Sequence, residues 1–264
     1  MEGWLSSHGH LDAAQRNQDA WKAAKAFWAN LKPNHVDEGV CRSYSQKRNR
    51  AARTVSYEIG IVRRALIWAE GQKTIERAPK LWLPPMPERV VRALTKQEFR
   101  TFLTGSNMPH IRLFAQIGVA TGGRKRAILD LKWEQVDFDR RLIQLNKTGR
   151  VQTAKKRATV PINDQLYDAL VDAKRGAITE WVIEYAGGPV LDIKKGFSSM
   201  AKRAGVPVTP HMLRHSAAVW MAEAGRPMAE IAQYLGHEDQ RTTERVYARF
   251  SPDFLRGAAK SLEW

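Results

Sequence analysis

Five side chains in short, distinctive settings suit chemistry on a phosphodiester. A guanidinium can donate paired hydrogen bonds to the non-bridging oxygens of a phosphate, and charge gathers on those oxygens in the transition state. The pKa of a tyrosine hydroxyl is ordinarily about 10, so it becomes a nucleophile only beside a proton acceptor or a strong positive field. The candidates are Arg124 in Thr121-Gly-Gly-Arg124, His211 and Arg214 in His211-Met-Leu-Arg214-His215, His237 in Leu235-Gly-His237, and Tyr247.

Each of these settings, taken singly, has a simple structural explanation, such as a surface turn for Arg124 or a half-buried helical aromatic for Tyr247. The His-x-x-Arg motif alone is a weak signal, which Thr209 and Pro210 just before it strengthen modestly because they predict a helix start. His211 and Arg214 would then share one face of the first turns, where unpaired backbone N–H groups attract an anion. Taken together, the five side chains favour phosphoryl transfer.

The leaving 5′-oxygen of such a reaction needs a proton donor, and a basic loop offers one. Residues 141–145 and 157–161 predict two strands of a hairpin. The loop between them contains Lys147, Lys155 and Lys156. A lysine in a flexible loop can protonate an oxygen as it departs.

The first part of the chain predicts helices with charge of one sign. Apolar residues recur at helical spacing within 11–31, 36–44 and 55–69, the last opened by Thr54 as N-cap. Glu58 is the only acid among residues 42–64. A charged run is usually a solvated face, but the single sign favours phosphate contacts. The expected DNA-binding residues are Arg42, Lys47, Arg48, Arg50, Arg53, Arg63 and Arg64.

A proline-rich stretch, APKLWLPPMPERV, predicts a stiff linker between two domains. After it, Thr95 and Glu98 form a capping box that opens a helix, and helices then alternate with short strands up to a final short helix within 253–262. The expected fold class is mostly α with a small antiparallel β-sheet.

The composition indicates a polyanionic partner. The chain has 43 Lys+Arg against 27 Asp+Glu, a net charge of +16 and a pI of about 10.2. Nucleic acid fits this balance first and an anionic membrane surface second, although a basic ribosomal factor would share it. No apolar run approaches the roughly 20 residues of a membrane span, no signal peptide is visible, and Cys41 alone cannot form an internal disulfide. We expect a cytoplasmic protein.

The order of Thr-Gly-x-Arg, a lysine hairpin, His-x-x-Arg-His, Leu-Gly-His and a tyrosine ten residues later resembles the tyrosine recombinase (phage integrase) family. The segments TGGRKRAILDLKWEQVDF, HMLRHSAAVWMAEAG and LGHEDQRTTERVYARFSPD are similar to bacteriophage and prophage integrases. The resemblance is dense over 121–250 and general before that. It implies a helical core-site DNA-binding domain over 1–88 and a mixed α/β catalytic domain over 89–264. Many relatives have an acidic residue where this chain has Ala127.

The resemblance also implies roles for the site residues. Arg124 and Arg214 match the phosphate-binding arginines, and Tyr247 matches the nucleophile. Lys147 lies in a Lys-Thr-Gly run found in some relatives, but Lys155 lies nearer the second strand, as in the relatives that this chain most resembles, and is preferred as general acid. His211 and His237 match the two histidine positions.

The reaction implied is transesterification through a 3′-phosphotyrosine, which keeps the ester energy and needs no ATP, metal or other cofactor. The implied partners are double-stranded DNA and accessory DNA-bending proteins, and no membrane is implied. The chain would form a homotetramer on paired DNA sites and would be a monomer without DNA. Integration, excision and chromosome-dimer resolution share this chemistry, and the similarity to prophage integrases favours the integration or excision of a prophage or genomic island. We expect the protein to act in a bacterial cytoplasm, with nucleoid association while acting, and to have no arm-binding domain ahead of Met1.

Two other classes of protein remain open from the sequence. A metal-dependent nuclease would stop in EDTA and leave no covalent adduct. A DNA-binding protein that has lost catalysis would bind without cutting.

Overall fold

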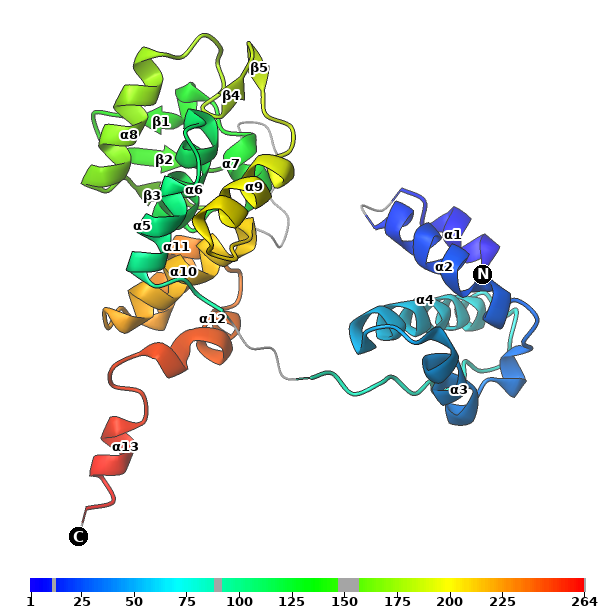
Figure 1. The fold of residues 1–264 in the computed structure, drawn as a ribbon. Helices are drawn as coiled ribbons and strands as arrows, with labels where there is room; N and C mark the ends of the chain where they lie inside the picture. Colours follow the sequence, from blue (N-terminus) through cyan, green and yellow to red (C-terminus); the bar gives the residue numbers. More distant parts are fainter. Residues whose placement is uncertain (11–12, 88–91, 147–156, 264) are drawn as a thin grey trace. The chain divides into compact units, whose positions relative to one another are not determined.

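The computed structural model describes residues 1–10, 13–87, 92–146 and 157–263, and the chain forms two compact units, Met1–Arg89 and Val90–Trp264 (Figure 1). The expected domain boundary at 88/89 lies outside the described residues. No helix among those residues is long and apolar enough to cross a membrane.

The first unit is helical, as its apolar spacing predicts. Its core is rich in aromatic side chains, including the buried Trp4, Trp21, Trp28 and Tyr44. The expected N-cap at Thr54 is wrong, because the last helix begins one turn earlier with Ala51 as its N-cap, and alanine is the best helix former. The elements are α1 (Glu2–Ser7), α2 (Ala14–Trp28), η1 (Pro33–His35), α3 (Glu38–Arg48) and α4 (Ala52–Gly71).

The second unit is mostly helical with two small antiparallel sheets, which confirms the expected fold class. Its helices are α5 (Lys96–Thr104), α6 (Pro109–Thr121), α7 (Lys125–Leu129), η2 (Trp133–Gln135), α8 (Asp164–Arg175), α9 (Lys194–Ala204), α10 (Pro210–Glu223), α11 (Met228–Leu235), α12 (Gln240–Tyr247), η3 (Ala248–Phe250) and α13 (Arg256–Lys260). The final helix is shorter than the expected 253–262.

The predicted hairpin is present as β2 (Leu142–Gln144) and β3 (Thr159–Pro161). They pair antiparallel with Ile143 opposite Val160, and β1 (Val136–Asp137) adds a third strand beside β2. A separate two-stranded hairpin is formed by β4 (Glu184–Tyr185) and β5 (Gly188–Pro189). The three-stranded sheet therefore carries the basic loop between its second and third strands.

Helix α6 is central to the core of this unit, where it packs against α7, α8 and α10 (Figure 1). Gly118 permits the close approach of α10, since a Cβ at this position would lie 2.6 Å from Leu213 Cδ1. The C-terminal end of α6 and the first turns of α10 are thereby brought together. Arg124 follows the end of α6 by three residues, and Arg214 lies in the first turns of α10.

Candidate active site

Arg124 and Arg214 are placed by the junction between α6 and α7. Gly122 ends α6 in the left-handed region at φ 59°, which favours glycine. The Thr121 hydroxyl donates to Ile117 O and accepts from Gly123 N, so the turn is fixed by its own side chain. Arg124 follows as the N-cap of α7. Arg214 comes from α10 and donates from Nη1 to Gly122 O at 2.7 Å.

Arg214 is a buried cation with hydrogen-bonding capacity to spare. It is 4% exposed, and its Nη2 has no hydrogen-bond partner among the described residues. Burial and, to a smaller extent, the positive charge of Arg124 lower the pKa of Arg214, while Tyr247 raises it, and together these effects bring it to about 10. Arg214 stays charged at neutral pH. A buried, unpaired charge of this kind favours the arrival of an anion.

His237 lies in the same positive field. Burial lowers its pKa to about 4, and Arg214 and Arg124 contribute to the shift, so the imidazole is neutral at pH 7. Its Nδ1 lies 2.7 Å from the hydroxyl of the fully buried Thr243, which fixes the ring. A neutral imidazole can donate one hydrogen bond from its other nitrogen when Nδ1 accepts from Thr243.

Tyr247 ends α12 and is 3% exposed, with its ring in an apolar cluster that includes Val219, Ile231 and Leu235. Its Oη lies 2.5 Å from Nδ1 of His215. The His215 ring in turn contacts that of His211, with centroids 4.4 Å apart. The expected candidates Arg124, His211, Arg214, His237 and Tyr247 are therefore linked by contacts or by electrostatic coupling in one site.

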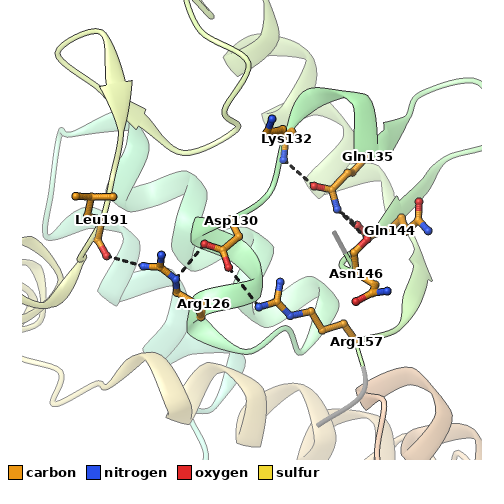
Figure 2. A network of polar contacts seen from close by, with 8 residues as sticks. All are labelled: Arg126, Asp130, Lys132, Gln135, Gln144, Asn146, Arg157 and Leu191. Carbon is orange, nitrogen blue, oxygen red and sulfur yellow. Dashed lines mark hydrogen bonds and ion pairs between the residues drawn. The ribbon is translucent and has the colours of Figure 1, made fainter. Parts of the chain in front are cut away.

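The two ends of the basic loop are anchored by polar contacts (Figure 2). Before the loop, buried Gln135 donates from Nε2 to Gln144 O at 2.6 Å and to Asn146 O at 3.2 Å. After the loop, Arg157 donates to Asp130 at 3.3 Å, and Asp130 also pairs with Arg126 at 3.0 Å. Lys147, Lys155 and Lys156 lie outside the described residues.

In the first unit, the exposed basic side chains do not all have the same surroundings. Arg53, Arg63 and Arg64 are exposed along one face of α4, and with Arg16 of α2 they line a groove of about 520 Å³. We call these four arginines the α4 cationic face. Tyr57 lies beneath Arg16, with the guanidinium carbon 3.9 Å from the ring centroid.

Two other expected DNA-binding residues have acidic partners. Arg48 donates twice to buried Glu58, at 2.9 and 3.0 Å, and Tyr44 donates to the same carboxylate at 2.6 Å. Arg42 pairs with Glu38. The remaining two, Lys47 and Arg50, are exposed.

Sequence reasoning assigned no role to His215, Thr243, Asp130 or Arg16. A signal for Thr243 existed, because it lies four residues before Tyr247 and hence on the same helix face. His215 was visible inside the His-x-x-Arg-His motif. The contacts of Asp130 and Arg16 depend on residues 27 and 41 positions away, Arg157 and Tyr57, and no local pattern reveals them.

Comparison with known proteins agrees with this geometry. The model of the phage integrase family matches residues 92–253. The chain is 31% identical over 196 residues to tyrosine recombinase XerA of Thermococcus onnurineus, covering 69% of this chain and 67% of XerA. It is 24% identical over 230 residues to the integrase of Salmonella phage P22, covering 81% of this chain and 58% of that protein.

Solved structures show the same fold. The Tn1549 transposon integrase, in complex with a circular intermediate DNA, has a TM-score of 0.82 at 16% identity and covers 99% of this chain and 98% of its own. A lambda integrase dimer bound to a core site has a TM-score of 0.69 at 18% identity, over 91% and 93% of the two chains. The family match extends over most of the chain and includes every described candidate catalytic residue. This chain belongs to the phage integrase family, the tyrosine recombinases, whose members cleave and rejoin DNA strands.

Proposed function

We propose that this chain is a site-specific recombinase in which Tyr247 attacks the scissile phosphate while Arg124 and Arg214 hold its non-bridging oxygens. The observation that carries the assignment is Arg214, a buried arginine with unpartnered Nη2, coupled electrostatically to both Arg124 and Tyr247. An entering phosphodiester would satisfy these donors and neutralise the repulsion between the two cations. His237, neutral and held by Thr243, supplies a further donor, and we assign the same role to His211.

The reaction consists of two exchanges at phosphorus. The Oη–P bond to Tyr247 forms as the P–O5′ bond breaks, which leaves a 3′-phosphotyrosine and a free 5′-hydroxyl. A 5′-hydroxyl from a partner strand then attacks, and tyrosine leaves. Preorganised guanidinium groups stabilise the charge that develops in both steps.

A denaturing gel tests the nucleophile. The protein is incubated in EDTA with a nicked suicide substrate that carries its recombination site, so that the cleaved fragment is lost and the adduct accumulates. A covalent protein–DNA band is expected with the unaltered chain and none with Tyr247→Phe. A band that persists in Tyr247→Phe, or cleavage without any adduct, would refute the assignment and favour a nuclease.

We assign the general acid to Lys155, and a bridging sulfur tests it. An alkoxide needs a proton as it leaves, whereas a thiol has an ordinary pKa of about 8.5 and a thiolate leaves without one. Lys155→Ala should cleave normal DNA roughly a hundredfold more slowly and recover on the 5′-thio substrate. Lys147→Ala should be mildly slow on both, and rescue of Lys147→Ala alone would reverse the assignment.

We assign DNA backbone contacts in the first unit chiefly to the α4 cationic face, because its arginines are exposed and line one groove. Replacement of Arg53, Arg63 and Arg64 together by Gln should reduce the log–log salt slope of DNA binding by about 2 to 3, since each neutralised phosphate contributes about 0.9. Arg175→Gln, which removes a partner of Asp172 on α8, is the matched control. An unchanged slope in the triple variant would show that the face is only solvated.

For assembly, we propose a homotetramer on paired DNA sites, with accessory DNA-bending proteins at some sites, that integrates or excises mobile DNA in the bacterial nucleoid. The end of the chain supports exchange between copies, since Phe254, Leu255 and Leu262 are 45%, 65% and 76% exposed. A groove of about 940 Å³ that includes Phe99, Trp220 and Met221 could receive such side chains. Removal of residues 252–264 should abolish pairing of two sites while binding to one site persists; intact pairing would contradict the exchange.

A further inference from the structure

The hydroxyl of Tyr247 contacts a nitrogen base, His215, to which none of the roles proposed above is assigned. We propose that His215 is the general base for Tyr247: its Nδ1 takes the phenol proton during cleavage and returns it during rejoining. This inference rests on the proposed function of Tyr247 and adds a residue to that reaction.

The geometry carries the inference. The distance from Tyr247 Oη to His215 Nδ1 is 2.5 Å, and a general base must lie in direct hydrogen-bond contact with the proton that it removes. Two different elements create the contact, because His215 comes from α10 and Tyr247 from α12. Their ring centroids are 5.8 Å apart with planes tilted by 52°, so the nitrogen lies toward the hydroxyl and the rings are not stacked.

Burial explains why the tyrosine needs such a partner. Tyr247 is 3% exposed and its ring packs against apolar side chains of α10 and α11. Bulk water therefore has little access to the hydroxyl, and its proton must pass to a neighbouring side chain or to the substrate. Nδ1 of His215 lies in direct contact with this oxygen atom.

His215 lies beside the proposed phosphate-binding groups. It follows Arg214 in sequence, while His211 lies one turn before it and contacts its ring. The ionisable side chains on α10 and on the elements packed against it are His211, Arg214 and Glu223 of α10, His110 and Arg112 of α6, Glu230 and Tyr234 of α11, Arg241, Glu244, Arg245 and Tyr247 of α12, and Arg249 of η3; His237 follows α11.

The proton and bond changes balance in both directions. In cleavage, the Tyr247 proton moves to His215 Nδ1, the Oη–P bond forms, the P–O5′ bond breaks, and the 5′-oxygen receives a proton from the general acid. In rejoining, the attacking 5′-hydroxyl returns its proton to that acid, and the departing Tyr247 Oη recovers its proton from His215.

Suicide-substrate cleavage as a function of pH tests the proposal with His215→Ala and His215→Asn. Asn places an amide near the Nδ1 position and can keep a hydrogen bond to Tyr247, but it cannot accept the proton. At pH 7 both variants should be on the order of a hundredfold slower, within the range for loss of a general base. The cleavage rates of the variants should keep rising with pH toward the ordinary pKa of tyrosine, about 10. The cleavage rate of the unaltered chain should instead reach a plateau above the ordinary pKa of histidine, about 6.5.

Added imidazole gives a second readout that a structural role would not produce. It should restore cleavage by His215→Ala in proportion to the concentration of its neutral form. It should not accelerate His211→Ala, which is expected to keep the pH profile of the unaltered chain at a lower rate.

The outcomes separate this proposal from the assignment of Tyr247. Normal adduct formation by His215→Ala and His215→Asn at pH 6 to 7 would refute the assignment of His215 as general base and would not affect the assignment of Tyr247 as nucleophile. A slow His215→Asn variant with an unshifted pH profile would show that His215 only orients the tyrosine, which also overturns the proposal. An adduct in Tyr247→Phe would refute the proposed function itself.

Discussion

Arg48 in the first unit, whose side chain is 25% exposed, and Arg214 in the second, which is buried, both lie on helices that pack in their units, yet their surroundings differ in one decisive respect. Arg48 meets a buried carboxylate, Glu58, whose second partner is Tyr44. Among the described residues, Arg214 donates one hydrogen bond, to the carbonyl of Gly122, and it lies near a second cation, Arg124, that lowers its pKa. The charge of Arg48 is therefore balanced by a carboxylate of the same unit, whereas the described contacts of Arg214 include no carboxylate.

The difference shows how a structural arginine is distinguished from a substrate-binding one. A buried ion pair needs its partner in order to be tolerated, whereas a buried cation without a counterion reduces stability unless a ligand supplies the charge. Arg48 therefore belongs to the architecture of α3 and α4. Arg214 belongs to a site that is complete only with an anion.

The same substitution at the two positions should produce opposite phenotypes, and the largest effect is expected on chemistry. Arg214→Met should slow suicide-substrate cleavage about a thousandfold, as expected from the loss of a preorganised donor to the transition state. Its urea unfolding free energy should be unchanged or higher, because an apolar side chain replaces an unpaired buried charge. A marked loss of stability with normal cleavage per folded molecule would break the comparison.

Arg48→Met should affect stability and not chemistry. Glu58 would remain buried without its cation, and such a loss costs about 3–5 kcal/mol. Urea unfolding of the first unit, followed by the fluorescence of its tryptophans, measures this cost, and Arg53→Met on the exposed face of α4 is the control. Stability equal to that of the control would show that Glu58 does not depend on Arg48.

A smaller effect is expected at the anchor of the basic loop. Asp130→Asn removes the charge that holds Arg157, and a hydrogen bond to a charged group contributes about 1.5–3 kcal/mol. Cleavage should slow by roughly tenfold, since about 1.4 kcal/mol corresponds to each factor of ten, and the deficit should shrink on the 5′-thio substrate. The control is Asp172→Asn, at an exposed pair on α8, which should cleave normally. If Asp130→Asn is equally slow on both substrates, the contact between Asp130 and Arg157 does not position the general acid.

The smallest effect concerns the protonation of His237. Its pKa of about 4 in the free protein lies below the ordinary value of about 6.5, so the unfolded chain binds a proton that the folded chain excludes. His237 should therefore reduce stability as pH falls from about 6.5 to about 4. A bound phosphodiester should raise this pKa, since its charge offsets the two arginines. NMR titration with and without DNA measures the change, and a free-state pKa near 6.5 would contradict the field described here.

Much of the catalytic unit was predictable because its signals are local. The Thr95–Glu98 capping box, the Thr209–Pro210 helix start and the hairpin of β2 and β3 all formed as expected. Each depends on residues within a few positions or on alternation along a strand. The Arg124, Arg214 and Tyr247 motifs could be found for the same reason.

The contacts that distinguish roles were not predictable, because they join distant segments. Arg48 was grouped with Arg53 as a phosphate contact because the sequence shows charge but not that Glu58 faces inward between α3 and α4. The His215–Tyr247 contact spans 32 residues and depends on how α10 and α12 pack. Spacing identifies the reacting groups, and packing decides their partners.

The central claim is that the unpaired charge of Arg214 exists to meet the scissile phosphate. Replacing one non-bridging oxygen of that phosphate by a methyl group removes its negative charge and tests this claim directly. With Arg214→Ala, cleavage of normal DNA should be severely slow, while cleavage of the methylphosphonate substrate should recover most of the lost rate, because little charge remains to be stabilised. An equal deficit on both substrates would show that Arg214 does not act on the phosphate and would contradict the account.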